Sequence, residues 1–200
     1  MLFRSKSNDS TRILVGGVDV HLSTNGGTAF NAISGNVHSD IHGIYSNPLN
    51  ANKVYILTDG GLFRSDNFST NTYECTDGYV TSQFYIGSVS PTNPNKIMCG
   101  AQDNYTNLYN GTLYWDPIIG GDGSFNAINP LRDQTQFASY QYLNVLRTDD
   151  DWTNYDYVIQ EPSSATGGNP AAFIAPFILC KSDTSVLYAG SNYLKKSTDG

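Results

Sequence analysis

The sequence predicts an all-β fold, a β-propeller built from four-stranded antiparallel blades. A hairpin of short apolar runs recurs along the chain, with first strands that start near residues 13, 54, 97, 137 and 186. These starts are separated by 41, 43, 40 and 49 residues, and a repeat of about 40 to 50 residues is typical of propeller blades. The polar composition agrees, because 16 of the 18 acidic residues are Asp and Asn occurs 20 times. Asp and Asn favour turns over helices.

The clearest copy of the hairpin lies in residues 53–65. Residues 54–57 form an apolar, β-favouring run, Asp-Gly-Gly at 59–61 forms a tight turn, and residues 62–65 form the second strand. Similar hairpins are expected at residues 13–23 and 186–197, and more diverged ones start at 97 and 137.

The repeat predicts a single propeller segment over residues 1–200. Its expected blades are, approximately, 1–34, 37–79, 82–122, 123–170 and a partial one at 172–200. Residues 2–5 match the end of a blade's first strand, and a turn motif breaks off at residues 197–200. We therefore expect the chain to begin and end inside a blade, as an incomplete piece of a larger propeller.

Charge and composition argue against several classes of protein. The net charge is −7 and the 11 basic residues are scattered, whereas nucleic-acid binders concentrate Lys and Arg. No apolar run is long enough to predict a transmembrane segment. Cys75, Cys99 and Cys180 lack metal-binding spacing, so we expect mainly buried thiols, with one disulfide left open.

A turn motif follows the first hairpin. Residues 23–30 fit the pattern S-x-D-x-G-x-x-W through Ser23, Asn25, Gly27 and Phe30, with Asn for Asp and Phe for Trp. In such a turn the Asn side chain caps backbone amides, the Gly takes a positive φ and the aromatic ring packs between blades. Weaker copies occur at 65–67, at 148–152 and at the end of the chain, through Ser197 and Asp199.

This motif resembles the Asp-box, or bacterial neuraminidase repeat. The succession of motifs at 38–42, 59–61, 83–85, 100–104 and 120–123 resembles large secreted bacterial propellers of the Asp-box group. These are akin to sortilin-type and xyloglucanase-type propellers, and many resemble type IX secretion cargo. The resemblance implies a propeller fold, a secreted or cell-surface location, and two partners: the remainder of a larger propeller polypeptide and a secretion machinery. It implies no single activity.

Three polar residues mark the expected first strand of the second blade. With a period of two, His38, Asp40 and His42 share one face with Ile44, while Val37, Ile41 and Tyr45 share the other. Two imidazoles and a carboxylate suit a divalent metal. The alternative is a polar lining that bonds to neighbouring blades and to water. Apart from this metal, no cofactor is expected.

Four carboxylates in Gly-flanked or channel-facing positions are candidates for catalysis: Asp40, Asp59, Asp103 and Asp122. An inverting glycosidase needs an acid and a base about 6.5–9.5 Å apart. Tight hairpins favour Asp and Asn regardless of function. Departures from the repeat are the stronger candidates for ligand binding, namely Gln102, Asp103 and Asn104 together with Asp122. Scattered Arg and scarce Glu argue against a sialidase.

Aromatic residues near the blade ends offer a second kind of site. Tyr105, Tyr109, Tyr114 and Trp115 either stack on sugar rings or pack in the core. The predicted function is a non-catalytic propeller segment that presents loops for binding a glycan or a protein. The alternative is a xyloglucanase-like inverting glycoside hydrolase that uses paired Asp carboxylates. A third hypothesis is secretion cargo whose function lies elsewhere in the full protein.

Overall fold

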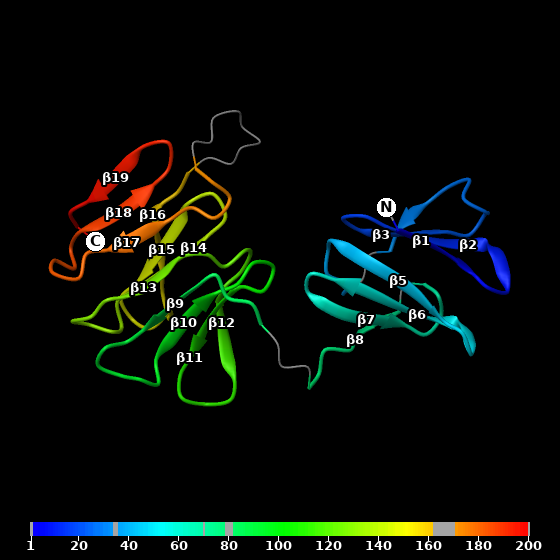
Figure 1. Ribbon diagram of the computed structural model, residues 1–200, viewed down its shortest axis with the longest axis horizontal. Coiled ribbons are helices and arrows are strands. Elements are labelled where there is room, and N and C mark those ends of the chain that lie inside the picture. Colours follow the sequence, from blue (N-terminus) through cyan, green and yellow to red (C-terminus); the bar gives the residue numbers. More distant parts are fainter. Residues whose placement is uncertain (1, 34–35, 70, 79–81, 162–170, 200) are drawn as a thin grey trace. The chain divides into compact units, whose positions relative to one another are not determined.

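The computed structural model describes residues 2–33, 36–69, 71–78, 82–161 and 171–199, and it confirms the all-β prediction. These residues form five antiparallel sheets, four with four strands and one with three (Figure 1). They contain no helix, and hence none that could cross a membrane.

The strands follow one another in sequence order within each sheet. The first sheet contains β1 (Leu2–Lys6), β2 (Asp9–Gly16), β3 (Val20–Ser23) and β4 (Asn31–Ala32). The second contains β5 (Ile41–Asn47), β6 (Asn50–Thr58), β7 (Gly61–Ser65) and β8 (Thr72–Glu74). The third contains β9 (Ile86–Val89), β10 (Ile97–Gly100), β11 (Thr106–Tyr109) and β12 (Trp115–Ile119). The fourth contains β13 (Asn126–Ile128), β14 (Gln136–Tyr140), β15 (Asn144–Thr148) and β16 (Asp156–Ile159). The fifth contains β17 (Phe177–Leu179), β18 (Leu187–Gly190) and β19 (Leu194–Ser197).

The chain divides into two compact units, Met1–Thr81 with two sheets and Ser82–Gly200 with three. One sheet lies inside each of the five expected blade segments. That all of them belong to one propeller segment over residues 1–200 stays a prediction. Part of residues 123–170, the stretch 162–170, lies outside the described residues, as does Gly200 of the last turn motif.

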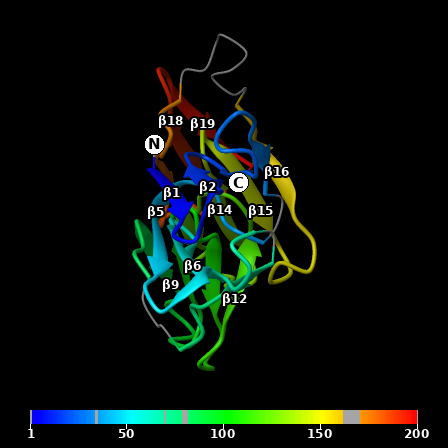
Figure 2. The ribbon, with the colours of Figure 1, turned by 90° about the vertical axis from the view of Figure 1, so that its right-hand side faces the viewer.

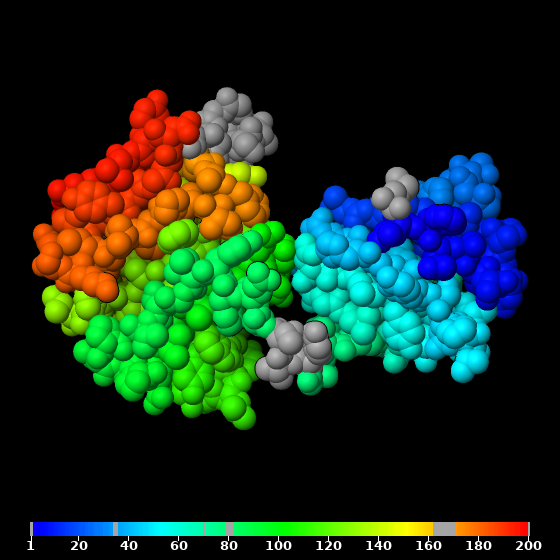
Figure 3. All heavy atoms as spheres, viewed as in Figure 1, coloured from blue at the N-terminus to red at the C-terminus, as the bar shows by residue number. Residues whose placement is uncertain are grey.

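Neighbouring sheets of a unit meet through their first strands. In the first unit β1 contacts β5, and in the second unit β13 lies between β9 and β17 (Figures 1 and 3). Each sheet continues away from this contact as a meander, and Figure 2 shows β14 and β15 side by side in one of them. Successive meanders joined at their first strands are the arrangement of propeller blades.

Apolar residues that alternate along the strands fill the spaces between sheets. In the first unit the core includes Leu14, Val54, Ile56 and the fully buried Phe68. In the second unit one core surrounds Phe137 and another contains Met98, Leu108, Ile128, Ala138 and Leu146. Cys75, Cys99 and Cys180 are free thiols, and burial raises the pKa of Cys99.

Asp-box turns follow the third strand of a sheet, at the point where the chain leads toward the place of a fourth strand. In the first sheet, Ser23 Oγ accepts the Gly27 N–H at 2.9 Å and Asn25 Oδ1 accepts the Ala29 N–H at 2.9 Å. The turn after β15 repeats this pattern, because Thr148 Oγ1 accepts the Trp152 N–H at 3.0 Å and Asp150 Oδ1 accepts the Asn154 N–H at 2.9 Å. The side-chain pair of the motif also forms between Ser65 and Asn67 and between Ser197 and Asp199.

The turns set the same strand register each time. In each motif, the residue just before the first Ser or Thr pairs with the residue eight positions after that Ser or Thr. The pairs are Leu22↔Asn31, Arg64↔Tyr73 and Arg147↔Asp156. Hydrogen bonds inside the turn fix its length and shape, so the register follows from local chemistry.

The aromatic residue of the first motif departs from the expected packing. Phe30 is 41% exposed, and its ring lies near Gly27 of its own turn instead of being buried between sheets. Gly27 has the expected positive φ of 90°. In the motifs without Gly, non-Gly residues take the left-handed conformation, among them Phe68 at 53° and Trp152 at 67°.

A basic side chain from one sheet reaches the Asp-box turn of the next. Arg12 Nη2 donates to Phe68 O at 3.2 Å in the first unit. In the second unit Lys96 Nζ donates to Asp151 Oδ1 at 2.6 Å, and Arg147 Nη1 donates to Asp199 O at 3.0 Å. Cations from different positions in one sheet therefore bind the Asp-box turn of the next sheet, and this accounts for several of the scattered basic residues.

Asp149 should make the second unit sensitive to acid. A hydrogen bond from Thr135, at 2.6 Å, and the guanidinium of Arg147 lower the pKa of the Asp149 carboxyl below 3.8. Because the folded-state pKa is the lower one, this contribution to stability is present above the unfolded value of about 3.9 and is lost as pH falls through the folded value. Asp149→Asn should therefore flatten the fall of the urea midpoint below about pH 4.

The matched control is Asp77→Asn, which changes a carboxylate in an exposed turn of the first unit. An Asp149→Asn variant whose midpoint fell with pH as steeply as that of the control would contradict the prediction.

Candidate functional site

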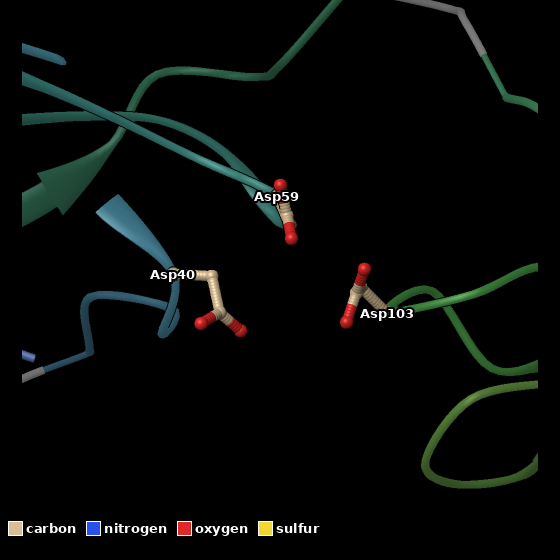
Figure 4. A group of neighbouring side chains, drawn as sticks. All are labelled: Asp40, Asp59 and Asp103. Atoms are coloured by element: carbon tan, nitrogen blue, oxygen red, sulfur yellow. The ribbon is translucent and has the colours of Figure 1, made fainter. Parts of the chain in front are cut away.

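Polar residues gather in the first unit where the segment before β5 meets the β6–β7 turn. His42 Nε2 bonds to Asp59 Oδ1, and a carboxylate oxygen of Asp40 lies within 4.8 Å of one of Asp59. The His38 ring lies against Gly60, where a Cβ atom would come within 2.3 Å of His38 Cγ. Figure 4 shows Asp40 on the segment that leads into β5 and Asp59 on the turn; Asp103 belongs to the other unit.

The expected alternation of residues 37–45 is wrong. β5 begins only at Ile41, because Asp40 takes a left-handed conformation with φ of 61°. The register then shifts between Ile41 and Gly43. As a result Ile41 and Ile44 are both buried while His42 and Tyr45 are exposed, so His42 does not share a face with Ile44.

The three expected metal ligands do not converge. Among the described residues of the first unit, no three His, Cys, Asp or Glu side chains bring their ligand atoms within 4.8 Å of one another. His38 Nδ1 lies 3.1 Å from Ser39 O, and since a carbonyl only accepts, this nitrogen carries the proton. His42 instead bonds to Asp59. The divalent metal stays a prediction. In this tautomer of His38, Nε2 is the unprotonated ring nitrogen and would be the metal ligand.

The two departures from the repeat in the second unit, the turn at residues 102–104 and Asp122, lie next to each other. Asp122 Oδ1, from the loop after β12, accepts the backbone N–H of Asp103 at 3.0 Å. The Asp122 N–H in turn donates to Gln141 Oε1 at 3.1 Å, which ties the loop to the turn between β14 and β15. Gln102 accepts a hydrogen bond from the Tyr85 hydroxyl, and its backbone oxygen accepts from Asn104 Nδ2 at 3.3 Å. Asp122 therefore holds the turn in place.

This turn is compact and strained. Asp103 and Tyr105 both have positive φ values, 60° and 67°. Gly100 and Gly123 allow the backbones to approach, because a Cβ atom at either position would lie 2.1 Å from a backbone oxygen, of Ser124 or of Tyr105. Left-handed non-Gly residues cost about 1–3 kcal/mol each and persist only where the surroundings enforce them.

Two of the candidate catalytic carboxylates lie close together in the first unit. The nearest oxygens of Asp40 and Asp59 lie within 4.8 Å of each other, whereas an inverting glycosidase holds its two carboxyl groups about 6.5–9.5 Å apart. In the second unit, one oxygen of Asp122 accepts a backbone N–H. The resolved pKa shifts of described carboxyls, those of Asp9, Asp149, Asp150 and Asp183, are all downward and caused mainly by hydrogen bonds. None of these four residues is a candidate for catalysis, so the glycoside hydrolase stays a prediction.

Aromatic side chains form a second cluster, on the sheet β9–β12. The Trp115 ring stacks on Phe84, with centroids 5.7 Å apart and planes 21° apart, and lies 5.2 Å from the Tyr109 ring. Phe84 is 39% exposed, and Tyr114, which precedes Trp115 in the sequence, is 66% exposed. Asn110 and Asp116, which follow Tyr109 and Trp115 in the sequence, are joined by a hydrogen bond from Asn110 Nδ2 to Asp116 Oδ2 at 2.8 Å. We call Phe84, Tyr109, Tyr114 and Trp115 the aromatic cluster.

The aromatic cluster lies where the third sheet departs from the repeat. The other connections after a third strand contain the Asp-box pair, whereas β11 and β12 are joined by a tight turn with Gly111 at φ of 93°. Sequence reasoning identified three members of the cluster but missed Phe84, which follows the expected third blade's start. The sequence signal that could have identified Phe84 is the pair of adjacent aromatic residues at 84–85. Tyr105 lies apart from the cluster, near Gly120.

The comparisons with known proteins concern fold alone. No family model matches the sequence, and no curated protein matches it. Solved structures do match. A GH74 xyloglucanase from Xanthomonas campestris is 10% identical with a TM-score of 0.47, over 98% of this chain and 36% of that one. An ancestral GH74 enzyme is 17% identical with a TM-score of 0.42, over 94% and 27%. YCF48 bound to a D1 peptide is 13% identical with a TM-score of 0.42, over 95% and 61%.

The chain is similar to part of larger β-propellers. It spans 27%, 36% and 61% of the three matched chains. The expected resemblance to xyloglucanase-type propellers is thus confirmed as a similarity of fold at low identity.

Proposed function

We propose that this chain is a non-catalytic propeller segment that binds a neutral glycan through the aromatic cluster of the sheet β9–β12. The observation that supports it is the stack of Phe84 on Trp115, which follows the exposed Tyr114 in the sequence. Aromatic faces bind the C–H faces of pyranose rings, and Tyr and Trp combine an apolar body with a polar tip. Asn110 and Asp116 offer hydrogen-bonding groups for sugar hydroxyls at the same place.

The charge of the chain favours a neutral ligand. With a net charge of −7, the chain repels uronic or sialic acid polymers. A neutral β-glucan presents hydroxyl groups and apolar ring faces without this repulsion. The ligand class is therefore a neutral polysaccharide.

The Asp residues support binding over hydrolysis. Asp122 and Asp150 cap backbone amides, and Asp59 bonds to His42. Burial, followed by the hydrogen bond with Tyr157, raises the pKa of Tyr140 to about 12, so this phenol stays protonated and is no nucleophile at neutral pH.

A secreted or cell-surface location belongs to the same proposal and rests on the resemblance of the Asp-box turns. The remainder of a larger propeller and a type IX secretion machinery are the partners that this location implies. Fractionation of the source cells, followed by mass spectrometry of peptides from residues 82–161, checks it. Peptides found in the cytoplasmic fraction alone would contradict it.

Tyr114→Ala should weaken binding of xyloglucan oligosaccharides about threefold to tenfold, because an aromatic contact contributes about 0.5–1.5 kcal/mol beyond its area. Isothermal titration of the full chain measures the dissociation constant. The control is Tyr193→Ala, which removes an equally exposed ring, 72% against 66%, from the fifth sheet. Equal affinity of the two variants, or no saccharide binding by the unmodified chain, would contradict the proposal.

A reducing-end assay on the same samples separates binding from hydrolysis. We expect no release of reducing ends from xyloglucan. Release that disappears in Asp40→Asn or Asp59→Asn would establish the glycoside hydrolase in place of the binding segment.

A further inference from the structure

The second unit contains a cavity of about 920 Å³ formed by the first strands of its three sheets. β9, β13 and β17 line it together with residues of β18 and β19. Small-molecule sites typically measure about 300–1,000 Å³, whereas protein interfaces are flatter and larger in area. The cavity has the size of a site for one small molecule.

The walls of the cavity are mainly apolar. Phe125 and Phe177 contact each other across the β13–β17 seam, with ring centroids 6.5 Å apart. Val89, Ile178 and Leu194 line the cavity with exposed fractions of 58%, 63% and 77%. Aliphatic side chains gathered around one concave surface mark a binding site, since water gains few hydrogen bonds there.

Two polar residues of the lining are already bonded to each other. Ser88 Oγ donates to Asn126 Oδ1 at 2.6 Å, and Asn126 Nδ2 donates to Ile86 O at 3.1 Å. These bonds hold β13 against β9 and leave the apolar walls to contact a ligand. They place the two strands without requiring a bound molecule.

Lys181 is the one charged residue among the described residues that line the cavity. Its acidic neighbour Asp183 is outside the lining, and the Asp183 carboxylate accepts hydrogen bonds from the Ser185 hydroxyl at 2.6 Å and N–H at 3.1 Å. Lys196 Nζ is 5.8 Å from the ring centroid of Tyr188, which lines the cavity, but its charge also acts on Asp183 and adds to those hydrogen bonds in lowering the pKa of that carboxyl. Lys181 therefore gives the cavity one positive charge that no acidic residue of the described lining opposes, and this favours an anionic group.

We propose that the cavity binds an amphiphile, a molecule with a hydrocarbon or aromatic body and one anionic head group. Ile178, Leu194 and the half-buried Phe125 contact the body, and Lys181 contacts the head group. The ligand, the residues and the sheets involved differ from those of the proposed glycan site, so this proposal is independent of it.

The test uses the full 200-residue chain and 8-anilinonaphthalene-1-sulfonate, an aromatic probe with one anionic group that fluoresces in apolar surroundings. Dodecanoate, below its micelle concentration, serves as competitor, and dodecyltrimethylammonium is the competitor of opposite charge. We expect one probe molecule per chain, displaced by dodecanoate at concentrations at least about tenfold lower than those needed of the cation.

Three variants locate the site. Ile178→Asp should lower the affinity for the probe at least about tenfold, because it places a carboxylate against the ligand's apolar body. Lys181→Gln should lower this affinity about twofold to fivefold, which is the range measured for exposed charge pairs. Leu131→Asp changes an 81% exposed Leu outside the cavity and should leave the affinity unchanged. Near-ultraviolet circular dichroism verifies that each variant is folded.

Unchanged probe affinity in Ile178→Asp, or equal displacement by the two competitors, would overturn the proposal. So would a dimer that Ile178→Asp converts to a monomer, measured by light scattering, since a second copy of the chain would then be the occupant.

Discussion

Gly100→Ala should destabilise the second unit by more than about 3 kcal/mol. A Cβ atom on Gly100 would lie 2.1 Å from Ser124 O and 2.7 Å from Ser124 N, both backbone atoms. Backbone atoms cannot move aside as the end of a flexible side chain can. The loop at 121–124 would have to leave the turn at 101–105, and the Asp103–Asp122 hydrogen bond would be lost with it.

Hydrogen exchange followed by mass spectrometry measures this effect by region. Protection should fall in β9–β14 and stay unchanged in β1–β8, which belong to the other unit. Gly17→Ala is the control, because a Cβ atom there meets nothing within 4 Å. Equal unfolding midpoints for the two variants would show that the turn relaxes without cost.

Phe137→Ala should cost about 3–5 kcal/mol of the free energy of unfolding. The side chain is fully buried and packs in the same core as Leu143, Val145 and Phe177. Its removal leaves a cavity that rigid strands on several sides cannot close. The Arg147 guanidinium, 5.7 Å from the ring centroid, also loses its contact with the ring.

Urea unfolding followed by circular dichroism gives the loss of stability. Phe3→Ala removes the same side chain from a position that is 68% exposed. It should change the free energy of unfolding by less than about 0.5 kcal/mol. A Phe137→Ala variant as stable as Phe3→Ala would mean that this core is loosely packed.

The turns illustrate what local sequence can predict. Ser23, Asn25 and Gly27 form their hydrogen bonds within seven residues, so the pattern alone places the turn. The same holds for the Asp59-Gly-Gly turn between β6 and β7. The diverged hairpin expected to start at residue 137 was more difficult, because the turn between β14 and β15 contains left-handed Tyr142 and Leu143 and no Gly or Pro.

The candidate sites depended on information that no short window contains. A strict period of two placed His38, Asp40 and His42 on one face, but left-handed Asp40 and the register shift after Ile41 separate them. Backbone hydrogen bonds at 2.8 Å, from the Asp40 N–H to Val18 O and from the Ile41 N–H to Gly17 O, tie this segment to the turn between β2 and β3 of the first sheet. In the same way, the stack of Phe84 on Trp115 joins residues from opposite ends of the third sheet.

The sequence by itself determined the all-β class, the five sheets and the positions of the Asp-box turns, because strand alternation and turn capping act over a few residues. Only the tertiary structure decided that Asp122 caps the turn of Asp103, that the aromatic residues cluster on the third sheet, and that β9, β13 and β17 enclose a cavity. The first two features join residues 19 and 31 positions apart within one blade, and the third joins strands of different sheets. These separations are longer than the few residues over which strand alternation and turn capping act, so no local pattern encodes the contacts.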